Sequence, residues 1–177
     1  MRVLGIDPGT GRLGWAVVEK KLGKETLIEC GCIETPAHTD LNIRLEVIFN
    51  QLNRIIKDLK PEQASVEDLF FATNRKTVMS VGAARGVVLL ACQLAGLKIA
   101  SYTPLQIKSS ITGYGAADKK QVEFMVKQIL KLPVIARESN DRGDPAPKIL
   151  DDTVDAIAAA LTHLARIKSV DNKAIIK

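Results

Sequence analysis

A short apolar segment near the start of the chain ends on an acidic residue and is followed at once by a turn. Residues 3–6 are Val-Leu-Gly-Ile, Asp7 comes next, and Pro8 and Gly9 then favour a reversal of the chain. A buried strand rarely contains an acid, because an unpaired buried charge costs several kcal/mol or more. Asp7 is therefore expected at the end of a strand, where a metal ion or a phosphate group would meet it. The alternative is that Asp7 starts the turn by bonding to its own backbone.

The length and composition of the chain predict a single globular domain. With 177 residues, 46% of them hydrophobic, the chain is long enough to bury one core and too short for two. Its 25 Lys and Arg residues against 20 Asp and Glu give a formal charge of +5, which favours a polyanionic partner. Asp7 and Pro8 would interrupt a signal peptide, and Arg85 and Gln93 interrupt the longest apolar region. We therefore expect a soluble, cytoplasmic protein without a membrane span.

The spacing of apolar residues predicts strands first and then an alternation of strands and helices. Strands are expected at residues 3–6, 12–18, 27–34, 64–69 and 98–102, and helices at 41–59, 78–94, 118–132 and 152–166. Asp40 is a candidate cap for the first helix, and Thr103 with Pro104 begins a further short helix. This order indicates a mixed sheet with helices on its faces, which is an α/β fold.

Two segments are expected to lie outside the rigid part of that fold. Residues 133–150 are polar and rich in Pro and show no apolar period, which predicts a flexible loop. Residues 167–177 follow the expected last helix and are interpreted as a frayed C-terminal tail.

Acidic residues mark the ends of three expected core elements. Asp7 follows the first strand, Glu67 and Asp68 end the fourth, and Asp152 and Asp155 begin the last helix. If the first and fourth strands are neighbours, Asp7 and Glu67 emerge at the same edge of the sheet. Acids gathered without His or Cys are hard oxygen donors, suited to Mg²⁺ or Mn²⁺. Two such ions can activate water and stabilise the leaving oxygen in phosphodiester cleavage.

Two of these assignments have alternatives that the pattern leaves open. Asp152 and Asp155, three residues apart at a helix start, also resemble a capping box and would interact favourably with the helix dipole. Glu67 and Asp68 compete for the position that faces the site, and the sequence around them does not choose between the two.

Five motifs follow one another along nearly the whole chain, at residues 1–9, 66–70 with Asn74, 82–87, 118–122 and 152–158. Together they resemble the motifs of the RuvC-type Holliday junction resolvases. The resemblance implies an RNase H-like fold, with a mixed five-stranded sheet flanked by helices, over a single nuclease domain at 1–177. It also implies a homodimer that nicks two strands of a four-way DNA junction symmetrically, in association with a branch-migration motor.

The resemblance assigns four acids as catalytic residues and ligands of Mg²⁺, with two ions per site and with Mn²⁺ as a possible substitute. These acids are Asp7, Glu67, Asp152 and Asp155, so the resemblance selects Glu67 over its neighbour. Family members vary at the position of Asp152, where His can stand, and metal binding or helix capping both remain open there.

One aromatic and several basic side chains are expected to contact DNA. The aromatic side chain that the family places at the junction centre corresponds to Phe70, although Phe71 beside it is an alternative. An exposed aromatic ring can stack on an unpaired base, and a helix that opens with Lys attracts phosphate. The expected set is Phe70, Arg75, Lys76, Lys108, Lys119 and Lys120.

Other functions remain as alternatives to a junction resolvase. A monomeric RNase H-like nuclease that processes ribosomal RNA precursors has a similar opening strand. An ATP-binding domain of the actin type also shares that hairpin, but this class needs two such domains and 177 residues are too few. A junction-binding protein without catalysis would not need the four acids.

Overall fold

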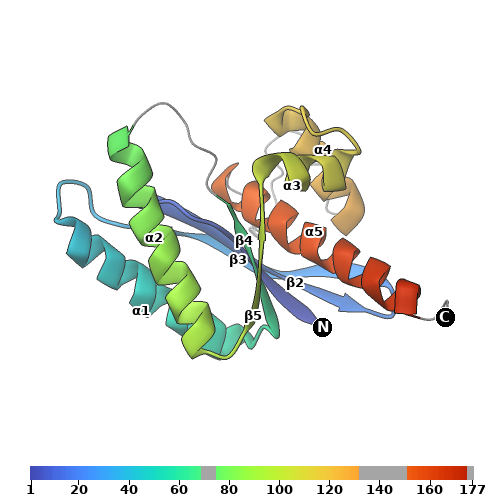
Figure 1. The fold of residues 1–177 in the computed structure, drawn as a ribbon, viewed down its shortest axis with the longest axis horizontal. Helices are drawn as coiled ribbons and strands as arrows, with labels where there is room; N and C mark the ends of the chain where they lie inside the picture. The colour runs from blue at the N-terminus through green and yellow to red at the C-terminus, as the bar shows by residue number, and fades with distance from the viewer. Residues whose placement is uncertain (69–74, 132–150, 175–177) are drawn as a thin grey trace, which may run out of the picture.

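The computed structural model describes residues 1–68, 75–131 and 151–174, with side chains described for 1–68, 78–131 and 153–167. Figure 1 shows helices on both faces of one central sheet. The elements are β1 (Arg2–Asp7), β2 (Arg12–Lys21), β3 (Lys24–Glu34), α1 (Leu41–Leu59), β4 (Gln63–Glu67), α2 (Arg75–Leu94), β5 (Lys98–Tyr102), α3 (Pro104–Thr112), α4 (Lys119–Leu130) and α5 (Asp151–Ala174).

The sheet is mixed, and its five strands lie in the order β3-β2-β1-β4-β5. β1 pairs antiparallel with β2 and parallel with β4, and β4 pairs parallel with β5. The predicted five-stranded mixed sheet, with its first and fourth strands adjacent, is therefore confirmed. Because β1, β4 and β5 run in the same direction, their carboxyl ends lie at one edge of the sheet.

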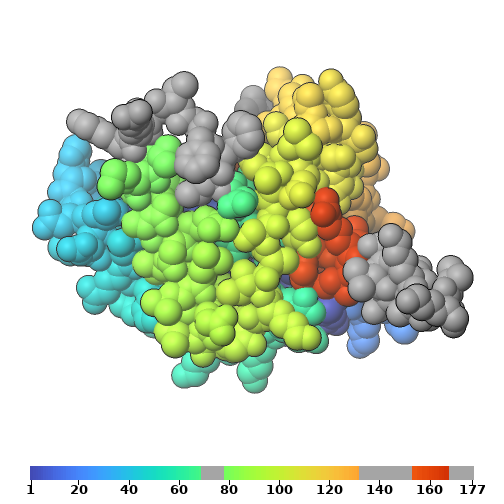
Figure 2. Space-filling model, viewed as in Figure 1, coloured from blue at the N-terminus to red at the C-terminus, as the bar shows by residue number. Residues whose placement is uncertain are grey.

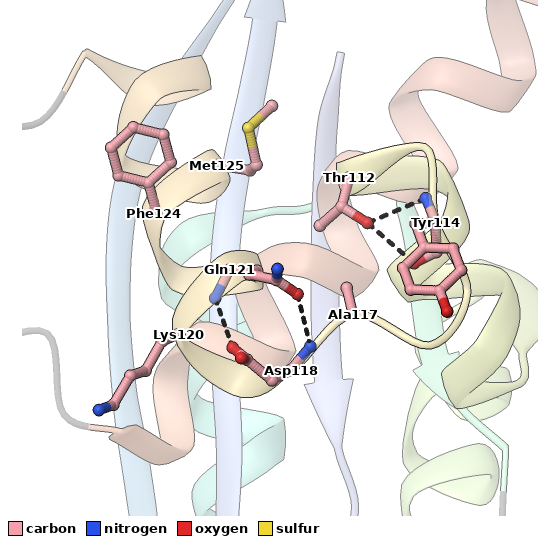
Figure 3. A pocket seen from close by; sticks show the side chains of 8 residues that line it. All are labelled: Thr112, Tyr114, Ala117, Asp118, Lys120, Gln121, Phe124 and Met125. Carbon is pink, nitrogen blue, oxygen red and sulfur yellow. Dashed lines mark hydrogen bonds between the residues drawn. The ribbon is translucent and has the colours of Figure 1, made fainter.

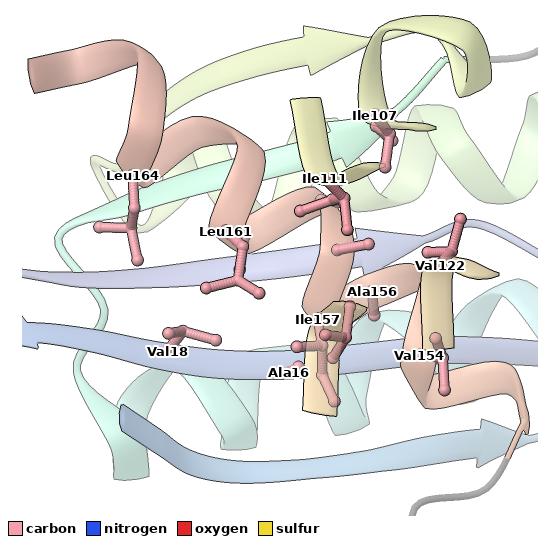
Figure 4. Close-up of a cluster of buried hydrophobic side chains, with 14 of the residues drawn as sticks. Ala16, Val18, Ile107, Ile111, Val122, Val154, Ala156, Ile157, Leu161 and Leu164 are labelled. Atoms are coloured by element: carbon pink, nitrogen blue, oxygen red, sulfur yellow. The ribbon is translucent and has the colours of Figure 1, made fainter. Parts of the chain in front are cut away.

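Strand alternation directs the two faces of the sheet into separate apolar cores. Leu4 and Ile6 of β1 pack towards α1 and α2, whereas Val3 packs beneath α5. Gly5 also faces α5, because a Cβ there would lie 2.0 Å from the carbonyl oxygen of Ala156. No larger residue fits this close approach. The core beneath α5 includes side chains of β2, α3 and α4 as well (Figure 4).

The bounds of several helices differ from the sequence prediction. α1 covers the predicted 41–59, but Asp40 at its N-cap position makes no side-chain capping bond. α2 begins earlier than predicted, at Arg75, and α5 continues to Ala174, beyond the predicted end at Arg166. Ile167, Val170 and Ala174 continue a helical spacing of apolar residues, which is a physical reason for the longer helix.

The predicted loop at 133–150 and the end of the predicted tail, 175–177, lie outside the described residues. In the part of the chain that is described, no helix is both long enough and apolar enough to cross a membrane.

Candidate active site

Three of the predicted acids meet at the carboxyl edge of the sheet, on the face covered by α5. Asp7 ends β1 and has the same strand parity as Gly5, which contacts α5. Glu67 ends β4 and has the same parity as Ser65, whose hydroxyl donates a 2.7 Å hydrogen bond to the carbonyl of Ala159 on α5. Asp155 belongs to α5 and interacts with Glu67 electrostatically. One site can therefore use all three carboxyl groups.

The electrostatics of Glu67 follow from this gathering of acids. Burial of its carboxyl group, followed by the charges of Asp7 and Asp155, raises the pKa of Glu67 to about 8. A hydrogen bond with Asp7 acts in the same direction, while the charge of Lys108 lowers the pKa. The neighbouring carboxyl groups therefore disfavour the ionisation of Glu67, and a bound divalent cation would relieve that repulsion.

Glu67 and Asp155 line a pocket of about 270 Å³, which we call the acidic pocket and which also contains two lysines. Lys108 comes from α3 and Lys119 from α4, and the Lys119 Nζ lies 3.7 Å from Oδ2 of Asp155. Apolar side chains of the same two helices line the rest of the pocket, namely Pro104 and Ile107 of α3 and Val122 of α4. The pocket thus places cationic groups beside carboxylates, as a phosphodiester substrate with metal ions would require.

Capping boxes fix the starts of the two helices that carry these lysines. Thr103 Oγ1 accepts a 3.2 Å hydrogen bond from the backbone N–H of Gln106. In return, Oε1 of Gln106 accepts a 3.0 Å hydrogen bond from the backbone N–H of Thr103. Asp118 and Gln121 form the same reciprocal pair at the start of α4. Our sequence prediction missed both boxes, although Thr-x-x-Gln and Asp-x-x-Gln are visible signals of a helix start.

Asp68 points away from the acidic pocket. Its Oδ1 lies 3.1 Å from Nη2 of Arg85 on α2, and the same nitrogen donates to the hydroxyl of Ser101 at 2.9 Å. Its backbone N–H donates to the carbonyl oxygen of Tyr102 at 2.8 Å. Asp68 therefore secures the end of β4 to α2 and β5, while Glu67 faces the pocket.

The donor set fits a hard divalent cation, although the described acids do not enclose one by themselves. Among the side chains that the structure describes, no three His, Cys, Asp or Glu residues form a group that holds a metal ion. The side chain of Asp152 lies outside the described set. The carboxylates present are nevertheless hard oxygen ligands, and Mg²⁺ retains several waters in most protein sites. The raised pKa of Glu67 and the donor chemistry together support the fit.

Of the other predicted site residues, some lie away from the acidic pocket and others have side chains outside the described set. Asp152 is the second residue of α5, which begins at Asp151, and hence lies two positions beyond the capping position. Lys120 follows Lys119 on α4 but lines a different pocket. Phe70 and its alternative Phe71 lie outside the described residues, and Arg75 and Lys76 begin α2 with side chains outside the described set.

A sheet of this order, with acids at the carboxyl ends of β1 and β4 and on the covering helix α5, defines an RNase H-like nuclease. The family model for the crossover junction endodeoxyribonuclease RuvC matches residues 3–163. The chain belongs to this family.

Individual relatives agree with the family match over nearly the whole chain. The crossover junction endodeoxyribonuclease RuvC of Roseiflexus sp. strain RS-1 is 43% identical over 162 residues, which cover 92% of this chain and 89% of that protein. The protein of the same name from Desulfitobacterium hafniense strain DCB-2 is 44% identical over 163 residues, 92% of each chain. The solved structure of Thermus thermophilus RuvC in complex with a Holliday junction substrate has a TM-score of 0.79 and 33% identity, and covers 95% of this chain and 96% of that one.

Proposed function

We propose that this chain resolves four-way DNA junctions as a crossover junction endodeoxyribonuclease, in recombination and repair. The observation that carries the proposal is the interaction of Glu67 with both Asp7 and Asp155, at a pocket that Glu67 and Asp155 line together with Lys108 and Lys119. Family membership over residues 3–163 supports the choice of DNA junctions as substrate. The related Thermus thermophilus RuvC, with a Holliday junction substrate in its complex, supports it further.

The chemistry is metal-dependent hydrolysis of a phosphodiester, with Asp7, Glu67, Asp155 and Asp152 as the residues that would hold Mg²⁺ or Mn²⁺. Two bound ions would supply an activated water and would stabilise the leaving oxygen. Metal binding would release to solvent the proton that the raised pKa of Glu67 retains near neutral pH, and the Glu67 carboxylate would then serve as a ligand. Lys108 and Lys119, which line the same pocket, are placed to attract the phosphate oxygens of the strand that is cut.

A cleavage assay with matched substrates tests this function. Equal amounts of a four-way junction, its linear duplex arms and a structured RNA are incubated with the purified protein, with and without Mg²⁺. We expect paired nicks in opposite strands of the junction, dependent on the metal, and little cleavage of the other substrates. Preferred cleavage of RNA would instead favour the ribosomal RNA nuclease, and binding without nicks would favour the non-catalytic alternative.

Symmetrical cleavage requires two equivalent sites, and we propose that α2 provides a homodimer interface. The side chains of Met79, Leu90 and Leu94 are 79%, 52% and 68% exposed, and with Ala83 and Gly86 they follow one face of the helix. α2 also lies at the surface of the molecule in the view of Figure 2. A second copy of the chain would cover this apolar stripe and would place two pockets about a twofold axis, as two equivalent DNA strands require. Association with a branch-migration motor remains a proposal from the family resemblance.

Replacement of Gly86 with Leu is expected to weaken the dimer and to leave the folded monomer intact. A Cβ at Gly86 would meet nothing within 4 Å in its own chain, so the larger side chain has space there. Helix propensity favours Leu over Gly by roughly 1 kcal/mol, and circular dichroism should show an intact helical fold. Sedimentation velocity would report a shift towards monomer, with a smaller shift for Gly86→Ala. A Gly86→Leu protein that dimerises as tightly as the wild type would contradict the assignment.

Replacement of Asp155 with Asn is expected to lower cleavage by two orders of magnitude or more, with little change in melting temperature. Asp155 is the fifth residue of α5, beyond the capping position, and Asn has nearly the same shape but lacks the charge that binds a divalent cation. The same reasoning applies to Asp152→Asn, for which the expected loss is smaller. Asp40→Asn, the same change at the start of α1, serves as the control and should cleave normally. Full activity in the Asp152→Asn, Asp155→Asn double variant would show that these acids serve only the helix.

A further inference from the structure

A second pocket lies directly beside the acidic one and is not used by the proposed chemistry. It has a volume of about 400 Å³ and lies between α4 and the loop that joins α3 to α4 (Figure 3). We call it the aromatic pocket and define it by Tyr114, Lys120, Phe124 and Met125. The N-terminal turn of α4 separates the two pockets, since Lys119 lines the acidic pocket and Lys120 the aromatic one.

The aromatic pocket contains the exposed aromatic side chains of the described part of the chain. Tyr114 is 65% exposed and Phe124 is 57% exposed. Among the other aromatic residues with described side chains, Trp15 and Tyr102 are buried and Phe49 is half-buried. In Figure 3 the two exposed rings lie on opposite sides of the pocket, with the Asp118–Gln121 cap between them. Two exposed rings at one pocket indicate a ligand with a flat apolar surface.

The charged side chains that line the aromatic pocket are one carboxylate, Asp118, and one ammonium group, Lys120. The carboxylate of Asp118 accepts a 2.9 Å hydrogen bond from the backbone N–H of Gln121. The carboxylate of Glu123 accepts a 2.6 Å bond from Nζ of Lys127, one turn further along α4. The Asp118 carboxylate at the pocket is thus committed to the helix cap, and Glu123, which does not line the pocket, is committed to Lys127. Among the lining residues, Lys120 supplies the cationic group that can meet a phosphate.

We propose that the aromatic pocket binds one unpaired nucleotide of the DNA substrate, with the base against Tyr114 and Phe124 and the phosphate near Lys120. Aromatic rings combined with a basic side chain are the usual elements of single-strand recognition. The inference rests on the proposed function, because a strand in the acidic pocket would pass from Lys119 to Lys120 across the first turn of α4. An apolar peptide would also fit the rings but would leave the position of Lys120 unexplained.

Binding of two DNA probes tests the proposal. The probes are a fluorescent oligothymidine of 20 nucleotides and a blunt duplex of 20 base pairs, and the variants are Tyr114→Ala, Phe124→Ala and their combination. Loss of a stacked base is expected to weaken oligothymidine binding by about tenfold or more and to change duplex binding little. Tyr114→Phe retains the ring and should restore binding. Leu22→Ala, at a fully exposed residue of the β2–β3 turn, is the control.

The location of the strand is tested by crosslinking. Oligothymidine that contains 5-iodouracil, irradiated with the wild-type protein and digested, is expected to give a peptide crosslinked at Tyr114 or Phe124. Unchanged oligothymidine affinity in the double alanine variant would overturn the inference and would leave a protein partner as the occupant of the pocket. Wild-type protein from the same preparation is assayed for junction nicking. Normal nicking together with unchanged variant affinity rejects only the inference, whereas absent nicking rejects the proposed function.

Discussion

Replacement of Asp7 with Asn is expected to abolish junction cleavage and to leave the melting temperature close to that of the wild type. Asp7 lies at the end of β1, where Asn has nearly the same shape and can make similar hydrogen bonds. It lacks the charge that holds a divalent cation, and a metal ion supplies several kcal/mol of charge stabilisation in such reactions. Turnover should therefore fall by several orders of magnitude. Single-turnover nicking of a labelled junction, at saturating protein, measures the effect without a contribution from binding.

The same variant should bind junction DNA at least as tightly as the wild type when Mg²⁺ is absent. One negative charge that faces the phosphate backbone has been removed, and salt-dependent binding rests on the basic side chains. Asp68→Asn is the matched control, because Asp68 pairs with Arg85 outside the acidic pocket. It should retain cleavage within a few-fold of the wild type. Normal nicking by pure Asp7→Asn protein would remove Asp7 from the active site.

The main elements of the fold could be predicted from local sequence because their signals are strong and periodic. The apolar spacing of α1 predicted its bounds, and the acid after four apolar residues predicted that Asp7 ends β1. The predicted end of α5 at Arg166 was wrong. A polar segment with a few apolar residues at helical spacing continues the helix to Ala174. Propensity alone is weak at helix ends, where packing and capping decide the boundary.

The candidate site was harder to predict because it depends on contacts between distant residues. The choice between Glu67 and Asp68 needed the family resemblance. In the structure, Glu67 faces α5 because it lies on the same side of β4 as Ser65. Ser65 contacts Ala159 of α5, which is 94 positions away in the sequence. The sequence also did not determine what packs against Gly86. A Gly in a helix indicates close packing, but it does not identify the surface that approaches it. Open space around Gly86 within its own chain now excludes packing against the sheet.

Tyr114 and Phe124 gave no signal in the sequence, because single aromatics on helices or in loops are most often part of a core. Their exposure at one pocket depends on how α3 and α4 pack together, and that packing is a property of the tertiary structure. The spacing of apolar residues predicts which side chains are buried, so it does not identify residues that function because they are exposed.

Replacement of Glu67 with Gln is expected to abolish cleavage. In the metal-free protein, the variant should also become more stable than the wild type, by a margin that increases with pH. The pKa of Glu67 increases from 4.5 to about 8 in the folded chain, mainly through burial and then through the charge of Asp7. Between these two values the folded state retains a proton that the unfolded state has lost. The free energy of unfolding of the wild type must therefore fall as the pH rises through this range. Gln does not titrate, so the free energy of unfolding of the variant lacks this decrease with pH.

Thermal unfolding in a chelator, measured across the range from pH 4.5 to about pH 8, gives the difference in melting temperature between Glu67→Gln and the wild type. We expect this difference to increase with pH. Glu46→Gln, at an exposed position of α1, is the control and should follow the wild type throughout. Addition of Mg²⁺ should reverse the order of stability above neutral pH, because the ion displaces the proton from Glu67 and has no comparable ligand in the variant. A difference that stays constant with pH would mean that Glu67 is already ionised without metal, and its carboxylate would then need another cation, such as Lys108, as its partner.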